Sequence, residues 1–402
     1  MVDKKVIIVC FTFPPVPGIG GRRWAKFSKY LLRNNIDVQV VTANQSYKKP
    51  SDWTNDITEL KSQKRINNFD FNYPHFLSKS ASNLIDKIGY KLSLYLVKQK
   101  IKGNIYDKSA LCKNKLFTQI IPLIEKGYNN IIVSVGPFFY STFFIELKHT
   151  YPNLNLVLDV RDPWTNNKMA FGYWALPKER LEVEKKAEEL VAKGFDKIIT
   201  VADEMGEYFV KKYLLKTDSV QTINNGFDYD DFRVNHNHTS NHTIVFTGTL
   251  YEKALDSFLI FFNQLNTLKT EYTFHFYGEV HESILPYFKG SDKLFYHEKI
   301  ALNLVYEKIA ESDACLLFLT DDLTFSFSTK FVEYLSQNKP ILVFSKPGKT
   351  GEFVNQNKLG FQMDNSNLND VLNLLKNNNP STYDISSFDV KNLTYKLIDL
   401  LN

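Results

Sequence analysis

Ser328-Thr329-Lys330-Phe331-Val332-Glu333-Tyr334-Leu335-Ser336-Gln337-Asn338-Lys339-Pro340 is followed directly by the apolar run Ile341-Leu342-Val343-Phe344-Ser345. Ser328 is a helix-capping residue type, and Asn338 with Pro340 can end a short helix. The apolar run that follows is typical of a buried strand. The stretch therefore predicts a helix that leads into a buried strand, the repeating pattern of α/β proteins with a parallel sheet.

Glu333 lies among the apolar residues of that helix. Burying an unpaired charge is costly, so a carboxylate in this place requires a partner, and a sugar with two neighbouring hydroxyls would supply one. The helix start at Ser328, preceded by the small residue Ser326, could hold a phosphate on its backbone N–H groups. A nucleotide site is one interpretation. The other is a surface Glu333 paired with Lys330, three residues earlier.

Length and composition exclude several classes of protein. The chain has 402 residues, which fits two domains, and a net charge of +5 without a dense basic stripe, which argues against nucleic acid as a partner. Cys10, Cys112 and Cys315 lie far apart, which is typical of reduced cysteines in a cytosolic protein. No apolar run is long enough to span a membrane.

The chain reads as two α/β series. The strand Val6–Phe11, the helix Arg22–Asn34 and the strand Asp37–Thr42 form a βαβ opening, which implies a parallel sheet. The further expected strands are Ile131–Val135, Leu156–Val160, Lys197–Val201, Thr243–Thr247, Tyr272–Tyr277, Leu294–Tyr296, Ala314–Leu319 and Pro340–Phe344. In the second series, helices are expected at about 256–268, 302–312, 329–337 and 367–377.

The polar stretch Asn235–His242 separates the two series and predicts a linker rather than a histidine metal site. We therefore expect an N-terminal domain over 1–234 and a C-terminal domain over 243–385, joined by the linker 235–242. The fold class is α/β, with two Rossmann-like parallel-sheet domains that face each other across a cleft. Ligands of such sheets bind at the carboxyl ends of the strands, so the cleft is the expected site.

Two further helices carry charged faces. Leu84–Lys102 is apolar on one side and rich in lysine, which fits either a helix packed on the core or a contact with a membrane surface. Lys178–Lys193 is crowded with Glu and Lys and is interpreted as a solvated helix.

The first strand–helix loop contains Gly18, Gly20 and Gly21. Gly18 and Gly20 fit the first two glycines of the dinucleotide-binding pattern Gly-x-Gly-x-x-Gly, but Arg23 occupies the position of the last one. The pattern also requires an acid at the end of the second strand, where this chain has Asn44. Both departures argue against NAD. The glycines of the loop allow either a close backbone approach to an anion or sugar, or only a tight turn.

Three other motifs follow strands or precede the linker. Asp159 to Trp164 places Arg161 and Asp162 beside an aromatic ring, which suits sugar binding or a braced loop. Thr247 to Lys253 offers Gly248 for close backbone approach and Lys253 for a phosphate, or only a turn with an exposed lysine. The Asp-x-Asp spacing of Asp228–Asp230 is too common to predict a metal, so no metal site is predicted.

These motifs, in this order, resemble the retaining glycosyltransferases of family 4 with the GT-B fold, in a branch that acts in surface polysaccharide assembly. The segments that carry the resemblance are Gly136-Pro137, Asp159–Trp164, Ile199–Val201, Ile223–Asp228, Thr247–Tyr251 and Ser328–Pro340. The likeness covers nearly the whole chain and is weakest over 45–130.

The resemblance implies roles for individual residues. Glu333 would hold the ribose hydroxyls. The donor diphosphate would be bound by Ser328, Thr329, Lys330, Gly248, Thr249 and Lys253, with Gly20 and Gly21 near the donor phosphates and the acceptor. Arg161, Asp162 and Lys253 are the expected catalytic residues. The final helix, over 386–402, would cross back onto the first domain.

The resemblance also implies an activity: a metal-independent transferase without a cofactor, which moves a hexose-type unit from a nucleotide diphosphate sugar to a glycan or lipid-linked glycan. It would be cytoplasmic, with a peripheral contact at the inner membrane face. Phe325, Thr142 and Thr249 replace a Glu, a His and an Arg of the family pattern. An epimerase on the same fold and a non-catalytic sugar-nucleotide-binding subunit therefore stay open as alternatives.

Overall fold

The computed structural model describes residues 4–77, 83–166, 172–232, 241–320, 326–363, 368–375 and 383–402. The described chain divides into two compact units, residues 1–223 with 394–402 (unit 1) and residues 224–393 (unit 2). Each contains a wholly parallel sheet, of seven strands in unit 1 and six in unit 2. The predicted α/β class with two parallel-sheet domains is confirmed.

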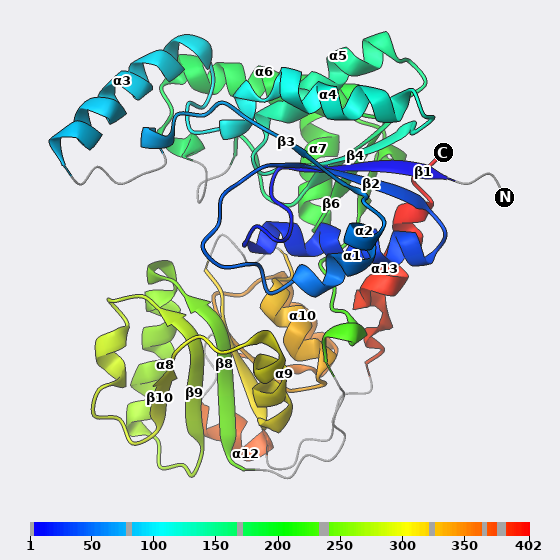
Figure 1. The fold of residues 1–402 in the computed structure, drawn as a ribbon. Helices are drawn as coiled ribbons and strands as arrows, with labels where there is room; N and C mark the ends of the chain where they lie inside the picture. The colour runs from blue at the N-terminus through cyan, green and yellow to red at the C-terminus, as the bar shows by residue number, and fades with distance from the viewer. Residues whose placement is uncertain are drawn as a thin grey trace. The chain divides into compact units, whose positions relative to one another are not determined.

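Unit 1 alternates strands and helices, as the βαβ pattern predicts. Its elements are β1 (Lys5–Cys10), α1 (Ile19–Arg33), β2 (Asp37–Ala43), α2 (Thr58–Ser62), β3 (Ile66–Phe69), α3 (Leu84–Lys100), α4 (Lys113–Ile124), β4 (Asn130–Ser134), α5 (Thr142–Thr150), β5 (Asn155–Val160), α6 (Lys178–Gly194), β6 (Lys197–Thr200), α7 (Asp203–Tyr213) and β7 (Val220–Thr222). The strand order is β3-β2-β1-β4-β5-β6-β7. Helices α1 and α2 lie on one face of this sheet and α4, α5 and α6 on the other (Figure 1).

Unit 2 repeats the pattern. Its elements are β8 (Thr243–Leu250), α8 (Leu255–Thr267), β9 (Thr273–Val280), β10 (Leu294–His297), α9 (Leu302–Glu311), β11 (Ala314–Phe318), α10 (Thr329–Ser336), β12 (Ile341–Phe344), α11 (Lys349–Gln356), β13 (Gly360–Gln362) and α12 (Leu368–Leu375). The strand order is β10-β9-β8-β11-β12-β13. Helix α13 (Val390–Ile398) follows, and residues 394–402 group with unit 1, where the Asn155 side chain donates to the Leu400 carbonyl (2.9 Å).

Side-chain alternation divides the core of unit 2 into two layers. On β8, Ile244 and Phe246 pack with α8 and α12, whereas Val245 between them packs with α9, α10 and α11. Successive strand residues point to opposite faces, so a sheet covered on both sides requires the continuous apolar runs seen in the sequence. Packing on both faces fixes the carboxyl ends of β8 and β9, where Gly248 and Gly278 lie.

Three sequence interpretations are wrong in detail. Strand β8 continues to Leu250, so Gly248 and Thr249 belong to the strand and not to a loop. Helix α6 is not a purely solvated helix, because Glu184 and Glu188 are buried. The apolar side of α3 is not packed on the core. The prediction of reduced cysteines is consistent with the structure, in which all three are buried and unbonded to one another.

Candidate functional site

In unit 2, two glycines lie opposite each other at the ends of β8 and β9. Gly248 (φ +104°) pairs with Gly278 (φ +136°). A Cβ on Gly278 would lie 2.2 Å from the Gly248 carbonyl oxygen, and a Cβ on Gly248 would lie 2.5 Å from Lys330 Cε. Side chains are excluded at both positions, so the Lys330 side chain can lie directly against the backbone of β8. Gly278 has no counterpart in the sequence prediction, although it directly follows an expected strand.

Lys330 lies in the first turn of α10. Its ammonium donates to the Thr249 carbonyl oxygen (2.8 Å) and lies 4.4 Å from the centre of the Phe246 ring. Burial lowers the pKa of Lys330 from 10.5 to about 8, and the nearby Glu333 carboxylate partly opposes that fall. The structure thus brings together Gly248, Thr249 and Lys330 of the predicted donor site.

The cap and the buried acid of α10 agree with the sequence prediction. Ser328 Oγ accepts a hydrogen bond from the Phe331 backbone N–H (3.2 Å), as a helix N-cap does. Thr329 is half-buried beside it. Glu333 is only 8% exposed, so the interpretation as a surface carboxylate is wrong. Lys253 lies apart on the exposed turn Glu252–Ala254 that follows β8.

In unit 1, Arg161 connects two strand ends to the first turn of α1, which contains Gly20 and Gly21, so the prediction that these two glycines lie in a loop is wrong. Its Nη1 donates to the Gly20 carbonyl oxygen (2.8 Å), its Nη2 donates to the Val135 carbonyl oxygen (3.3 Å), and its Nε lies 3.8 Å from Asp159 Oδ2. A Cβ on Gly20 would lie 3.0 Å from Nη1, so the start of α1 approaches the guanidinium closely at a glycine. Arg161 therefore braces the start of α1 and also stays at the carboxyl edge of the sheet.

Gly21 and Asp162 complete the set predicted in unit 1. A Cβ on Gly21 would lie 3.2 Å from the Phe13 backbone, so this glycine lets the start of α1 pack closely against the preceding loop. The Asp162 side chain reaches solvent, yet the atoms packed around its carboxyl group raise its pKa, and Arg161 opposes that rise. A carboxyl group with a raised pKa at a strand end is one property of a catalytic acid or base.

Asp159 anchors this part of unit 1. It is fully buried and accepts hydrogen bonds from Trp24 Nε1 (2.7 Å), Ser134 Oγ (2.8 Å) and Arg23 Nε (3.2 Å). It thereby fixes α1 against the ends of β4 and β5. The sequence placed Asp159 in a motif, but nothing local could indicate that Arg23 and Trp24 are its partners.

A cavity of about 430 Å³ lies between the Phe13–Val16 loop and the ends of β2 and β3. Thr42, Asn44, Gln45, Tyr47, Lys61 and Asn68 are among the residues that line it. Thr42 is buried, and within the described residues its hydroxyl makes no hydrogen bond. A hydroxyl without a partner in a lined cavity is suited to a polar ligand.

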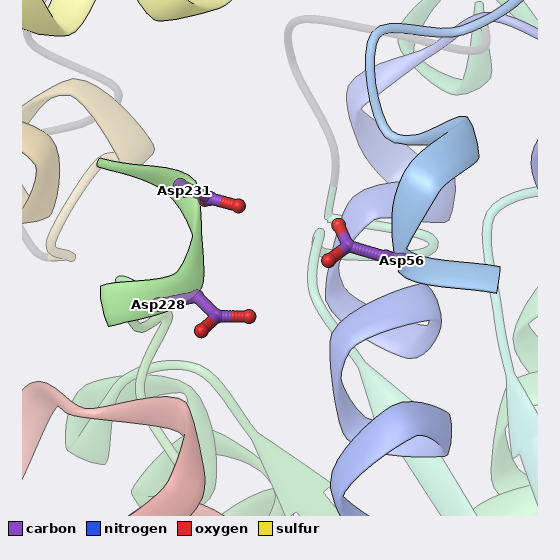
Figure 2. Close-up of side chains that lie close together, drawn as sticks. All are labelled: Asp56, Asp228 and Asp231. Atoms are coloured by element: carbon purple, nitrogen blue, oxygen red, sulfur yellow. The ribbon is translucent and has the colours of Figure 1, made fainter. Parts of the chain in front are cut away.

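The remaining acidic motif is explained locally. Asp228 Oδ1 accepts from the Asp230 backbone N–H (3.0 Å), which caps the short turn Tyr229–Asp231, and Asp231 accepts from the Tyr306 hydroxyl (3.3 Å). Figure 2 shows the side chains of Asp228 and Asp231. In unit 1, Asp56 forms ion pairs with Lys26 and Lys29, both at 3.0 Å. The Asp-x-Asp spacing thus has a structural role in unit 2.

Comparison with known proteins places the fold. No family model and no curated protein sequence matches the chain. The solved structures that resemble it include HepE of Anabaena in complex with UDP and glucose (TM-score 0.58, 14% identity, 98% of each chain covered). A glycosyltransferase of Rickettsia africae has a TM-score of 0.57 and 14% identity, with 100% of this chain and 95% of that one covered.

A third similar structure is a Listeria monocytogenes protein proposed to be a UDP-N-acetylglucosamine 2-epimerase (TM-score 0.51, 11% identity, 99% of this chain and 95% of that one covered). No described helix is long and apolar enough to cross a membrane. Together with the two parallel sheets, these likenesses show that the chain has the two-domain, Rossmann-like GT-B fold.

Proposed function

We propose that the chain is a glycosyltransferase that moves a sugar from a nucleotide diphosphate sugar to a glycan or lipid-linked glycan acceptor. The transfer would retain the anomeric configuration and require no metal, and it would serve cell-surface polysaccharide biosynthesis at the cytoplasmic face of the membrane. In this proposal residues 243–385 form the donor domain, and residues 1–234 with the helix at 386–402 form the acceptor domain.

The observation that carries the proposal is the cluster of Gly248, Thr249, Lys330 and Glu333. The Lys330 ammonium is half-buried, and burial makes its charged form less favourable. It lies against the β8 backbone at Gly248, where no side chain intervenes. A diphosphate at this place would compensate the charge, with the start of α10 supplying N–H donors. Glu333 follows one turn later, where its carboxylate could accept hydrogen bonds from both ribose hydroxyls. The diphosphate and the ribose of one nucleotide are thus both matched by residues of one helix.

We assign the remaining roles as follows. Lys253 and Lys330 stabilise the negative charge that develops on the departing diphosphate. Stabilising such a charge in the transition state lowers the barrier to transfer. Arg161 and Asp162, with Gly20 and Gly21, contact the transferred sugar and the acceptor. The cavity with the Thr42 hydroxyl, lined by amides, a tyrosine and lysine, is suited to a sugar of the acceptor, because sugars bind through such polar groups.

Two alternatives remain. The likeness to the Listeria protein favours an epimerase, which would convert the nucleotide sugar without any acceptor. A non-catalytic subunit would bind the nucleotide sugar and leave it unchanged. It rests on Thr142, which lies at the start of α5, and on Phe325, which lies outside the described residues.

The test uses the full chain with a panel of UDP-, GDP-, dTDP- and CMP-sugars, each with and without a mixture of lipid-linked glycans. Release of nucleotide that depends on acceptor, with a product whose anomeric configuration matches the donor by NMR, is expected. A changed sugar without acceptor would indicate the epimerase, and binding without turnover would indicate the subunit. Glu333→Gln should weaken donor binding roughly 10-fold or more, as expected for lost hydrogen bonds to a charged group, whereas the exposed Glu352→Gln should not.

A further inference from the structure

Helix α3 exposes a continuous apolar surface. Six large apolar residues on this helix are between 49% and 74% exposed: Leu84, Ile85, Ile88, Leu92, Tyr95 and Leu96. The helix projects from the rest of unit 1 (Figure 1). Single exposed apolar side chains are ordinary, but a contiguous group of this size marks an interaction surface. We call these six residues the α3 face.

The spacing of these residues places them on one side of the helix. With 3.6 residues per turn, positions 84, 88, 92 and 95 lie above one another, and 85 and 96 lie beside them. The opposite side of α3 is the packed one, where Ser93 and Val97 are buried. The α3 face therefore points away from the unit to which the helix is attached.

The helix is held in this orientation. Val97 packs with Ile101 and Ile105 in a small core. Arg180 of α6 donates to the carbonyl oxygens of Ile101 (2.7 Å) and Gly103 (2.9 Å), just beyond the helix end. These contacts fix the rotation of α3, so the α3 face cannot turn inward without breaking them.

Charge indicates what covers this face. The helix contains four lysines, at positions 87, 91, 98 and 100, and a single acid, Asp86. By the same helical geometry, Lys87, Lys91 and Lys98 lie along one border of the α3 face. An apolar face bordered by lysines is the pattern of a helix that lies in the surface of a membrane with anionic lipids. A second copy of this chain would instead bring the same lysines together.

We propose that the α3 face lies in the headgroup region of a bilayer that contains anionic lipid, with the apolar side chains buried among the upper acyl chains. Lys87, Lys91 and Lys98 would contact the lipid phosphates. The helix would lie along the surface. Vesicle binding needs neither donor nor acceptor, so this proposal can fail or succeed independently of the proposed transfer reaction.

The test is co-sedimentation of the full chain with vesicles of phosphatidylcholine alone, or with one quarter phosphatidylglycerol. Binding to the anionic vesicles is expected, with at least 10-fold weaker binding to the neutral ones and a loss at 0.5 M salt. The double variant Ile88→Gln, Leu92→Gln should bind at least 10-fold more weakly. Leu190→Gln changes another exposed apolar residue, on α6, and as the control it should bind as the wild type does.

A second variant tests the charge. Lys87→Gln with Lys91→Gln keeps the α3 face and should weaken binding to anionic vesicles. All variants should unfold at the wild-type temperature, because the changed side chains are exposed. Absence of vesicle binding, or equal binding by the Ile88, Leu92 variant, would overturn the proposal. If the wild type does not bind vesicles but forms a dimer in sedimentation equilibrium, and only the Ile88, Leu92 variant abolishes that dimer, the α3 face would instead contact a second copy of the chain.

Discussion

Lys330→Met should stabilise the folded protein at neutral pH while it weakens nucleotide binding. The fall of the Lys330 pKa from 10.5 to about 8 means that folding makes the charged form less favourable by about 3 kcal/mol. Methionine has a similar length and no charge, so it avoids that cost. The variant loses the hydrogen bond to the Thr249 carbonyl, worth about 1.5–3 kcal/mol. We expect a net gain of about 1 kcal/mol at pH 7.

The pH dependence has a definite sign. Between pH 8 and 10.5 the unfolded lysine is protonated and the folded one is not, so the unfolded state binds more protons and stability rises with pH. From pH 8 to 9.5 the free energy of unfolding of the wild type should therefore rise by about 2 kcal/mol relative to Lys330→Met. Urea unfolding of both proteins across this range measures the difference.

The same shift predicts proton uptake on nucleotide binding. A diphosphate beside Lys330 would raise its pKa, so UDP binding at pH 8.5 should take up about 0.7 proton at this residue. Calorimetry in two buffers of different ionisation enthalpy measures that uptake. Equal proton uptake by the wild type and Lys330→Met would refute the placement of the diphosphate at this lysine. Lys308→Met, on the exposed side of α9, is the control.

Three further predictions concern the scaffold of the site. Gly278→Ala should destabilise unit 2 by about 2 kcal/mol or more, since its Cβ would lie 2.2 Å from the Gly248 oxygen; a urea midpoint equal to the wild type would contradict this. Asp159→Asn should cost about 3–5 kcal/mol by leaving the buried Arg23 charge unpaired, and a loss below 1 kcal/mol in urea unfolding would disprove that role. Burial raises the pKa of Glu184 to about 7, so its folded carboxyl group stays protonated where the unfolded one ionises. The free energy of unfolding of the wild type, relative to that of Glu184→Gln, should therefore fall as the pH rises from 4.5 to 7. Identical pH profiles of the two proteins would contradict this prediction.

Buried central strands could be predicted from the sequence because they consist of continuous apolar runs. Of the four edge strands, β10 was expected at Leu294–Tyr296, but β3, β7 and β13 could not be predicted. Ile66-Asn67-Asn68-Phe69 and Gly360-Phe361-Gln362 are short and contain polar residues, since an edge strand is less buried than a central one. The start of α10 was predictable because Ser328 is a local cap.

The features of the site that the sequence could not predict depend on contacts between distant segments. Asp159 receives hydrogen bonds from α1 residues more than a hundred positions away, and Gly278 matters only because Gly248 lies opposite it. Whether the apolar side of α3 is packed or exposed could not be decided from the sequence, for a related reason. Amphipathic spacing identifies an apolar face, but only tertiary structure shows which side of the helix is covered.

We propose that unit 2 binds a nucleoside diphosphate through Lys330 and Glu333. The most direct test is thermal unfolding of the wild type and of Glu333→Gln with UDP, GDP, dTDP and CMP, with and without a chelator. A ligand that binds only the folded state raises the unfolding temperature. We predict stabilisation by one nucleoside diphosphate that persists in chelator and is reduced in Glu333→Gln. No shift with any nucleotide at millimolar concentration, or an equal shift in the variant, would contradict the account.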